Sequence, residues 1–321
     1  MKAQPGQPGR ERNYLLTLAY DGSGFSGWQR LGGGARTVQK TLEDALSSML
    51  GERINVIGAG RTDAGVHAEG QAANFRTVSG LGADELRSAL DGALPPDLCC
   101  VSVREAVPEF HARYRAVSKT YAYRFHDGPI RDPFEARWSL HVGRRLDVSA
   151  MREACAALVG ERDYSALSNA KEDARGFVRN LFEARVERRG DLVEVGFRAD
   201  GFLYNQARVM AACAMEAGLG RMPPGRLAEL VASKDRSRAP GALGAYGLRL
   251  LRVEYRADDF SGPGSGRPEP RRPDRDEGPP PGQARVRSDG LSSGRPSGEP
   301  GRGDRRPRGC DGRSPRSPEP R

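Results

Sequence analysis

Strand and helix patterns alternate along both halves of the chain, and this mixture limits the possible folds more than any other feature of the sequence. Residues 14–20 resemble a strand, and residues 38–49 repeat apolar side chains at helical spacing after Thr37, a typical N-cap. Residues 181–188 and 192–198 resemble a strand pair around a short turn. Turns between neighbouring strands favour antiparallel pairing. We therefore predict an α/β (α+β) fold of two similar mixed halves, with largely antiparallel sheets and a groove between them.

Three further patterns are predicted to form the centre of this fold. Residues 71–75 are expected to form a strand, and residues 202–217 a buried helix. Residues 119–125 alternate as a strand that places Tyr121 and Tyr123 on one face.

The end of the chain has a different composition. Residues 261–321 contain 14 Arg and 9 Asp plus Glu, so +5 of the net charge of +9 lies there and +4 remains for residues 1–260. This segment has 13 Pro, 12 Gly and no aromatic residue. It is too poor in apolar side chains to offset its chain entropy, so we expect disorder. The predicted organisation is a flexible leader at 1–12, α/β domains at 13–115 and 116–257, and a disordered tail at 258–321.

Cysteine content and hydropathy narrow the functional classes. The five cysteines are odd in number and contain no C-x-x-C pair, which argues against a disulfide framework or a zinc site. No segment approaches the roughly 20 apolar residues of a membrane span. We expect a cytoplasmic protein without a metal and without a membrane association.

The segment from Gly58 to Ala68 concentrates small residues around Arg61, Asp63 and His67. A neighbouring cation favours the ionised form of a carboxyl group, and a carboxylate can attack an electrophile or stabilise positive charge. Considered alone, this triplet is more often a structural ion pair in a turn. His67 has no nearby His or Cys partner in the sequence, which favours a hydrogen-bonded loop histidine over a proton carrier.

Two other segments combine aromatic side chains with polar or basic ones. Trp28 lies in a Gly-rich loop, where it could equally stack on a nucleobase or anchor the loop. Arg113, Lys119 and Arg124 alternate with aromatic residues in a pattern suited to phosphate contacts and base stacking. Strand aromatics are nevertheless more often core residues.

In its ordered motifs the chain resembles the tRNA pseudouridine synthase A family from about Tyr14 to Tyr255. The agreement extends over both halves, which makes it more specific than any single motif. It comprises Tyr20-Asp21-Gly22, Phe25 to Gln29, Thr37-Val38-Gln39, Leu42-Glu43, Ala45-Leu46, Gly58 to His67, Gly70-Gln71, Leu94-Pro95, Asp97, Phe110 to Arg113, Lys119, Tyr121, Tyr123, Phe202-Leu203 and Arg208.

The resemblance implies an isomerase that converts uridine to pseudouridine at positions 38, 39 and 40 of the tRNA anticodon stem-loop. It also implies a homodimer, a basic active-site cleft between the two sheets, and no metal or organic cofactor. Asp63 would be the nucleophile, and Arg61 would pair with it and assist extrusion of the base. Tyr121 would stack on the target base, and Arg208 would orient the carboxylate from the second half.

Two other functions are compatible with parts of the sequence. The first is an RNA-binding protein without turnover, which retention of Arg61, Asp63 and Tyr121 argues against. The second is a hydrolase that uses Asp63 as a nucleophile on a small substrate. Such a reaction would not need the basic and aromatic strand at 119–125.

Overall fold

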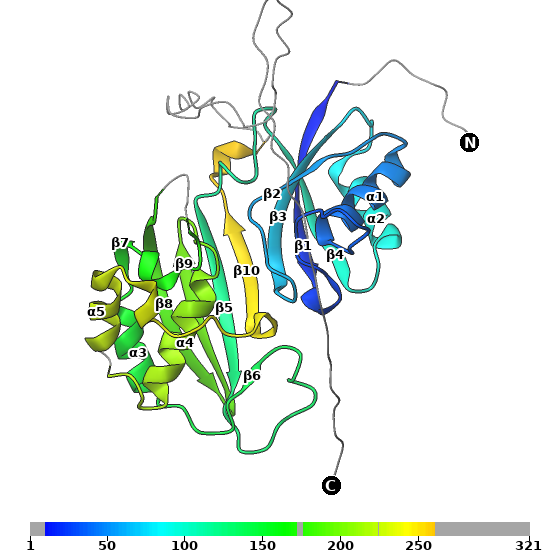
Figure 1. Ribbon diagram of the computed structural model, residues 1–321. Helices are drawn as coiled ribbons and strands as arrows, with labels where there is room; N and C mark the ends of the chain where they lie inside the picture. The colour runs from blue at the N-terminus through cyan, green and yellow to red at the C-terminus, as the bar shows by residue number, and fades with distance from the viewer. Residues whose placement is uncertain (1–9, 172–175, 224, 261–321) are drawn as a thin grey trace, which may run out of the picture. The chain divides into compact units, whose positions relative to one another are not determined.

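One sheet extends through both halves of the protein (Figure 1). The structure is a computed structural model, and it describes residues 10–171, 176–223 and 225–260. The main path of the sheet has the order β4-β1-β3-β10-β5-β9-β8-β7, while β2 pairs with β3 and β6 with β5. The strands are β1 (Arg12–Tyr20), β2 (Val56–Gly58), β3 (His67–Thr77), β4 (Leu98–Ala106), β5 (Ser118–His126), β6 (Leu140–His141), β7 (Gly160–Asp163), β8 (Val178–Arg189), β9 (Leu192–Ala199) and β10 (Leu248–Glu254). The helices are α1 (Val38–Leu50), α2 (Ala83–Ala93), α3 (Val148–Ala156), α4 (Gln206–Gly218) and α5 (Gly225–Ser233).

In the first half, β1 lies between β3 and β4 and is antiparallel to both. Helix α1 begins where the sequence predicts, because the hydroxyl of Thr37 accepts a hydrogen bond from the backbone of Lys40. It ends at Gly51, whose φ of 70° is favourable for glycine. Helix α2 packs on β4 and α1, and Leu42, Leu46, Leu86 and Leu90 are among the core side chains.

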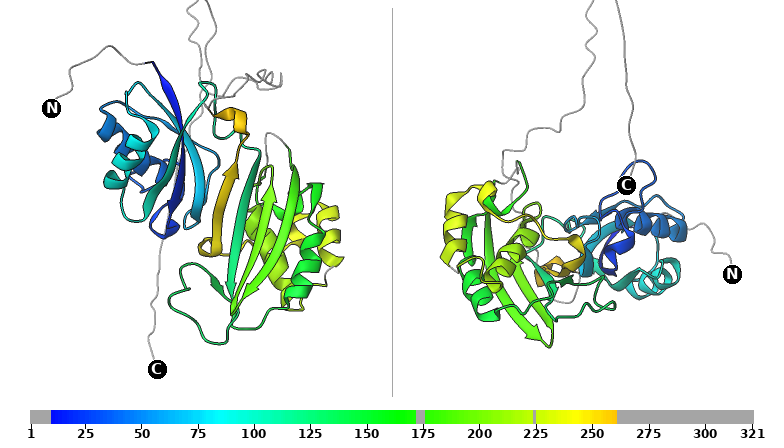
Figure 2. Two further views of the ribbon diagram at one scale, coloured as in Figure 1. Left: turned by 180° about the vertical axis from the view of Figure 1, so that it is seen from behind. Right: turned by 60° about the horizontal axis from the view of Figure 1, so that its bottom comes forward.

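In the second half, β8 and β9 form the predicted antiparallel hairpin and β9 continues the sheet to β5. Tyr121, Tyr123 and Phe125 are buried, as expected for residues that share one face of β5. Helices α3 and α4 pack on each other and against this sheet. Figure 2 shows the sheet from behind, with the strands on the near side and these helices beyond them.

Strand β10 joins the two halves. It runs parallel to β3 at Arg249↔His67 and antiparallel to β5, and it lies between them in Figure 1. All the other main-path pairs are antiparallel, so the prediction of a largely antiparallel α/β fold is confirmed. Because β10 comes from the end of the folded chain, its pairing brings the loop before β3 next to the second half.

Two predicted elements begin at different residues in the structure. The strand expected at 71–75 begins at His67, so it directly follows the loop that carries Asp63. The helix expected at 202–217 begins four residues later, at Gln206. Its start is delayed because Asn205 has a left-handed backbone with φ of 59°, which a right-handed helix cannot contain.

The described chain extends to Phe260, which is 8% exposed and forms a β-bridge with Ala106. It therefore includes the first three residues of the segment predicted as tail. The rest of that segment, 261–321, and leader residues 1–9 lie outside the described residues. The domain boundary between residues 115 and 116 remains a prediction.

Candidate active site

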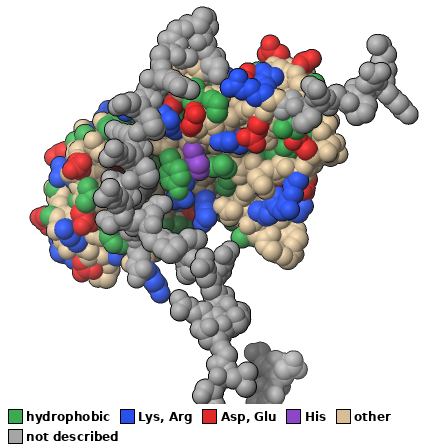
Figure 3. Space-filling model, turned by 90° about the horizontal axis from the view of Figure 1, so that it is seen from above, with side chains coloured by type: hydrophobic (Ala, Val, Ile, Leu, Met, Phe, Trp, Pro, Cys, Tyr) green, Lys and Arg blue, Asp and Glu red, His purple; other side chains and the backbone are tan. Residues whose placement is uncertain are grey.

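A cavity of about 750 Å³ lies where the two halves meet. Most of its lining comes from residues 56–66, 111–121 and 201–208, three segments that are far apart in the sequence, and Trp28, Gln29, Gln39 and Leu248 complete it. This volume is within the range of small-ligand sites, about 300–1,000 Å³. On the face shown in Figure 3, basic, acidic and hydrophobic side chains lie close together near a histidine. The charged side chains that line the cavity are Arg61, Arg113, Lys119 and Arg208 against the single carboxylate of Asp63.

The loop that carries Asp63 is fixed by close packing at its start. A Cβ on Gly58 would lie 2.5 Å from Cε2 and Nε1 of Trp28, so only glycine allows the indole to lie on the backbone at this position. The backbone N–H of Trp28 donates to the carbonyl of Thr62, and the Thr62 hydroxyl lies 2.9 Å from that of Tyr20. The residue before Asp63 is thereby held to the first half of the fold.

Asp63 receives two hydrogen bonds from the second half of the chain. Arg208 Nη1 donates to Asp63 Oδ2 at 2.9 Å, and Asn205 Nδ2 donates to the same oxygen at 2.7 Å. Arg208 Nε also donates to the carbonyl of Leu243 at 2.6 Å, which fixes the guanidinium at a second point. The Asp63 side chain is 34% exposed, so it is held in place and still accessible from the cavity.

Arg61 has a different position from the one that the resemblance implies. It lines the cavity and is exposed, and within the described residues it forms no ion pair with Asp63. The cation on Asp63 is that of Arg208, 145 residues later in the chain. Arg61 is thus available at the rim of the cavity, where it can contact a ligand.

Tyr121 forms a buried aromatic wall of the cavity. Its ring is 7% exposed and makes an edge contact with Phe202, with the centroids 4.9 Å apart. Burial raises the pKa of the Tyr121 hydroxyl well above its ordinary value, and the nearby Tyr20 and Asp63 raise it further. The hydroxyl is therefore protonated at neutral pH, and the ring offers a neutral surface for an aromatic ligand.

The four residues suggested for RNA contacts lie in three different environments. Arg113 lines the cavity and is exposed, and Lys119 lines it while donating to the carbonyl of Ala59 at 2.6 Å. Trp28 also borders the cavity but is only 2% exposed, which supports the loop-anchor interpretation. Arg124 is not among the cavity residues and forms ion pairs with Glu135 and Glu194.

His67 is hydrogen-bonded, as the sequence predicts, but it is the first residue of strand β3 and not a loop residue. Its Nδ1 accepts a hydrogen bond from the backbone of Gly22 and lies 3.2 Å from a carboxylate oxygen of Asp21, while Nε2 lies 3.1 Å from the carbonyls of Arg137 and Tyr246. Burial lowers the pKa of His67, which is 2% exposed. It is not among the residues that line the cavity.

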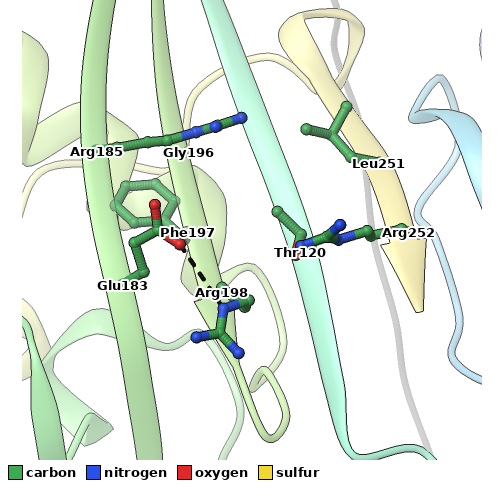
Figure 4. Close-up of a pocket in the computed structure, with 8 residues that line it drawn as sticks. All are labelled: Thr120, Glu183, Arg185, Gly196, Phe197, Arg198, Leu251 and Arg252. Carbon is green, nitrogen blue, oxygen red and sulfur yellow. Dashed lines mark ion pairs between the residues drawn. The ribbon is translucent and has the colours of Figure 1, made fainter. Parts of the chain in front are cut away.

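A smaller cavity of about 210 Å³ lies over strands β5, β8, β9 and β10 (Figure 4). Its most evident charged contact is the ion pair between Arg198 and Glu183, 3.7 Å apart. Arg198 also pairs with Glu254 and Arg185 with Glu187. Arg252, the remaining charged residue of this lining, also pairs with Glu254, so each charged side chain of the smaller cavity is in an ion pair.

Two features are absent from the described residues. They contain no group of three or more His, Cys, Asp or Glu side chains that could hold a metal ion. None of the helices in residues 10–171, 176–223 and 225–260 is long and apolar enough to cross a membrane.

Sequence comparisons agree with the motifs in both halves. A family model described as tRNA pseudouridine synthase matches residues 17–115 and 154–256. The chain is 37% identical over 243 residues to "tRNA pseudouridine synthase A 2" of Bacillus anthracis, which covers 76% of this chain and 99% of the relative. It is 38% identical over 243 residues to "tRNA pseudouridine synthase A" of Bacillus sp. (strain KSM-64), with the same coverage. The protein with that name in Caldicellulosiruptor bescii is 37% identical over 244 residues, 76% of this chain and all of the relative.

Proposed function

Since the chain belongs to the tRNA pseudouridine synthase A family and is an isomerase of tRNA uridine, we propose that its target is uridine at positions 38, 39 and 40 of the anticodon stem-loop. The observation that supports a uridine site is the carboxylate of Asp63, held by two hydrogen bonds in a cavity of about 750 Å³ with a basic lining. Positions 38, 39 and 40 rest on the family resemblance. The side chains of Arg61, Arg113 and Lys119, which line this cavity, can contact the phosphates that surround a target nucleotide.

The reacting uridine must leave its stack before the cavity can receive it. Extrusion costs a few kcal/mol, and stacking on an aromatic ring contributes about 1 to 3 kcal/mol per base. Tyr121 provides such a ring, and the exposed Arg61 at the rim can occupy the space that the base leaves. Arg113 and Lys119 then contact the backbone, while Trp28 and Arg124 act indirectly by holding the loop and the sheet.

Isomerisation breaks the bond between C1′ and N1 of uridine and forms one between C1′ and C5. Asp63 is the group placed to promote this change, as a nucleophile on C1′ or C6 or as a base at C2′. Arg208 keeps the carboxylate oriented in each of these routes. The neutral hydroxyl and buried ring of Tyr121 help to exclude water while the detached uracil turns.

The same proposal extends to assembly and location. We expect a homodimer in the cytoplasm, on the support of the family resemblance, and no metal or organic cofactor in the reaction. Sedimentation analysis of the full chain tests the dimer, since a monomer at micromolar concentration would contradict it.

Tritium release from tRNA tests the function directly. C5 of uridine loses its hydrogen when it becomes bonded to the sugar, so a transcript tritiated at C5 releases tritium on isomerisation. We expect release from an unmodified tRNA and none when the uridines at positions 38, 39 and 40 are replaced by cytidine. Tritium release from the transcript with these three cytidines would show that the target uridine lies elsewhere in the tRNA. Binding without release would indicate an RNA-binding protein, and turnover of a small substrate without tRNA would indicate a different enzyme.

A further inference from the structure

The two oxygens of the Asp63 carboxylate have different surroundings. Oδ2 accepts hydrogen bonds from both Arg208 and Asn205. Oδ1 has no hydrogen-bond partner within residues 10–171, 176–223 and 225–260. A carboxylate held through one oxygen in this way leaves the lone pairs of the other unused, in a residue that lines the cavity.

The amide of Asn205 is itself held by a chain of hydrogen bonds that leads away from the cavity. Its Oδ1 accepts from Asn169 Nδ2 at 2.9 Å. Asn169 Oδ1 accepts in turn from Arg236 Nε at 2.8 Å. Arg236 is further fixed because its Nη1 donates to the carbonyl of Ala239 at 3.1 Å. Neither Asn169 nor Arg236 lines the cavity.

The chemistry of the two ends fixes the direction of every bond in this chain. A guanidinium can only donate, and an ionised carboxylate can only accept. With Arg236 at one end, Asn169 must present its oxygen to Arg236 and its NH₂ to Asn205. Asn205 must then present its own NH₂ to Asp63. These donor and acceptor rules fix which atom of each side-chain amide is O and which is N, although an amide has nearly the same shape when the two are exchanged.

The backbone at Asn205 supports the same role. Its φ of 59° belongs to the left-handed region, which asparagine enters more readily than most residues. The neighbouring carbonyl of Tyr204 accepts hydrogen bonds from the backbone of Asn169 and from the Ser168 hydroxyl. The turn before α4 is therefore attached to the segment that carries Asn169, and Asn205 cannot move independently of it.

We propose that Arg236, Asn169 and Asn205 form a positioning relay that holds Asp63 through Oδ2 and leaves Oδ1 as the reacting oxygen. The inference rests on the proposed function, because it assigns the relay to the step in which Asp63 reacts. None of the three residues needs to touch the uridine. Their loss should therefore lower the rate of the bound complex much more than its affinity for tRNA.

Breaking the relay at its far end provides the test. Arg236→Glu replaces the donor with an acceptor, so Asn169 either loses its partner at position 236 or turns and sets its own oxygen against that of Asn205. In both cases Asn205 loses the contact that holds its amide toward Asp63. Arg236→Lys keeps a donor at the same position and should rescue the relay. The matched control is Arg238→Glu, the same charge change on an exposed residue of the same short 3-10 helix, Arg236–Arg238.

We measure single-turnover tritium release at saturating protein, tRNA affinity and thermal stability for each variant. The expected fall for Arg236→Glu is on the order of 10-fold, the upper end for loss of one ordinary hydrogen bond, because the bonds of the relay are solvent-exposed. Arg236→Lys should stay within about threefold of the unaltered protein and Arg238→Glu should match it, because the relay is then intact. All three variants should bind tRNA within about threefold of each other.

A second variant decides the outcome if Arg236→Glu fails to fold. Asn169→Asp still accepts from Arg236 but can no longer donate to Asn205, so it should lower the single-turnover rate without weakening tRNA binding. Normal rates in the folded variants would overturn the relay, as would an Arg236→Lys variant that is as slow as Arg236→Glu. An unaltered protein that releases no tritium would instead refute the proposed function.

Discussion

Replacing Gly58 with alanine probes the packing that fixes the Asp63 loop. The new Cβ would lie 2.5 Å from two atoms of the Trp28 indole and 2.7 Å from a third, Cζ2, all shorter than real Cβ contacts. The indole has little room to retreat, because it is 2% exposed and lies near the Tyr20 ring, with centroids 6.5 Å apart. Overpacking of this kind costs about 1–3 kcal/mol. At roughly 2–4 °C per kcal/mol for a domain of this size, Tm should fall by about 2–12 °C.

A double-mutant cycle isolates the contact. Trp28→Phe removes the part of the indole that collides, so Gly58→Ala should destabilise that background less than it destabilises the unaltered protein. The control is Gly92→Ala in helix α2, where a Cβ meets nothing within 4 Å. This change should raise the free energy of unfolding by about 0.4–1 kcal/mol. Calorimetry measures all the variants, and an equal loss from Gly58→Ala in both backgrounds would refute the packing argument.

Two further predictions concern Arg208 and His67. Arg208→Gln removes a hydrogen bond to the charged carboxylate of Asp63, worth about 1.5–3 kcal/mol. Single-turnover tritium release should therefore fall roughly 10- to 150-fold, with tRNA affinity nearly unchanged. The control is Arg221→Gln, on a 60% exposed side chain just after α4, which should have no such effect. Burial lowers the pKa of His67, so the unfolded chain binds the extra proton first and the free energy of unfolding should decrease as pH falls below about 6.5. Chemical denaturation between pH 7.5 and 5.5 should show a smaller decrease for His67→Gln, and equal slopes would contradict this explanation.

The elements that the sequence predicts correctly are those with local causes. The ends of helix α1 follow from Thr37 as N-cap and Gly51 as stop, since capping involves residues within one turn. The hairpin of β8 and β9 likewise follows from two strand patterns around a short turn. The buried face of β5 follows from the alternation of its aromatic residues.

The contacts that build the site are distant in sequence and could not be predicted in the same way. Asp63 has Arg61 two residues away, yet its ion pair is with Arg208. The parallel pairing of β10 with β3 has no local signal, although it joins the halves. Asn205 was missed because a left-handed residue ahead of a helix leaves only a weak trace in the sequence, and its hydrogen bond to Asp63 spans 142 residues.

The most direct test of the central claim is tritium release by the Asp63→Asn variant. The amide keeps the size of the side chain but loses the charge, so we expect no isomerisation and tRNA affinity within a few fold of the unaltered protein. Asp44→Asn, on an exposed residue of helix α1, is the matched control and should retain full activity. Turnover by Asp63→Asn comparable with that of the control would contradict the assignment of Asp63 as the reacting carboxylate.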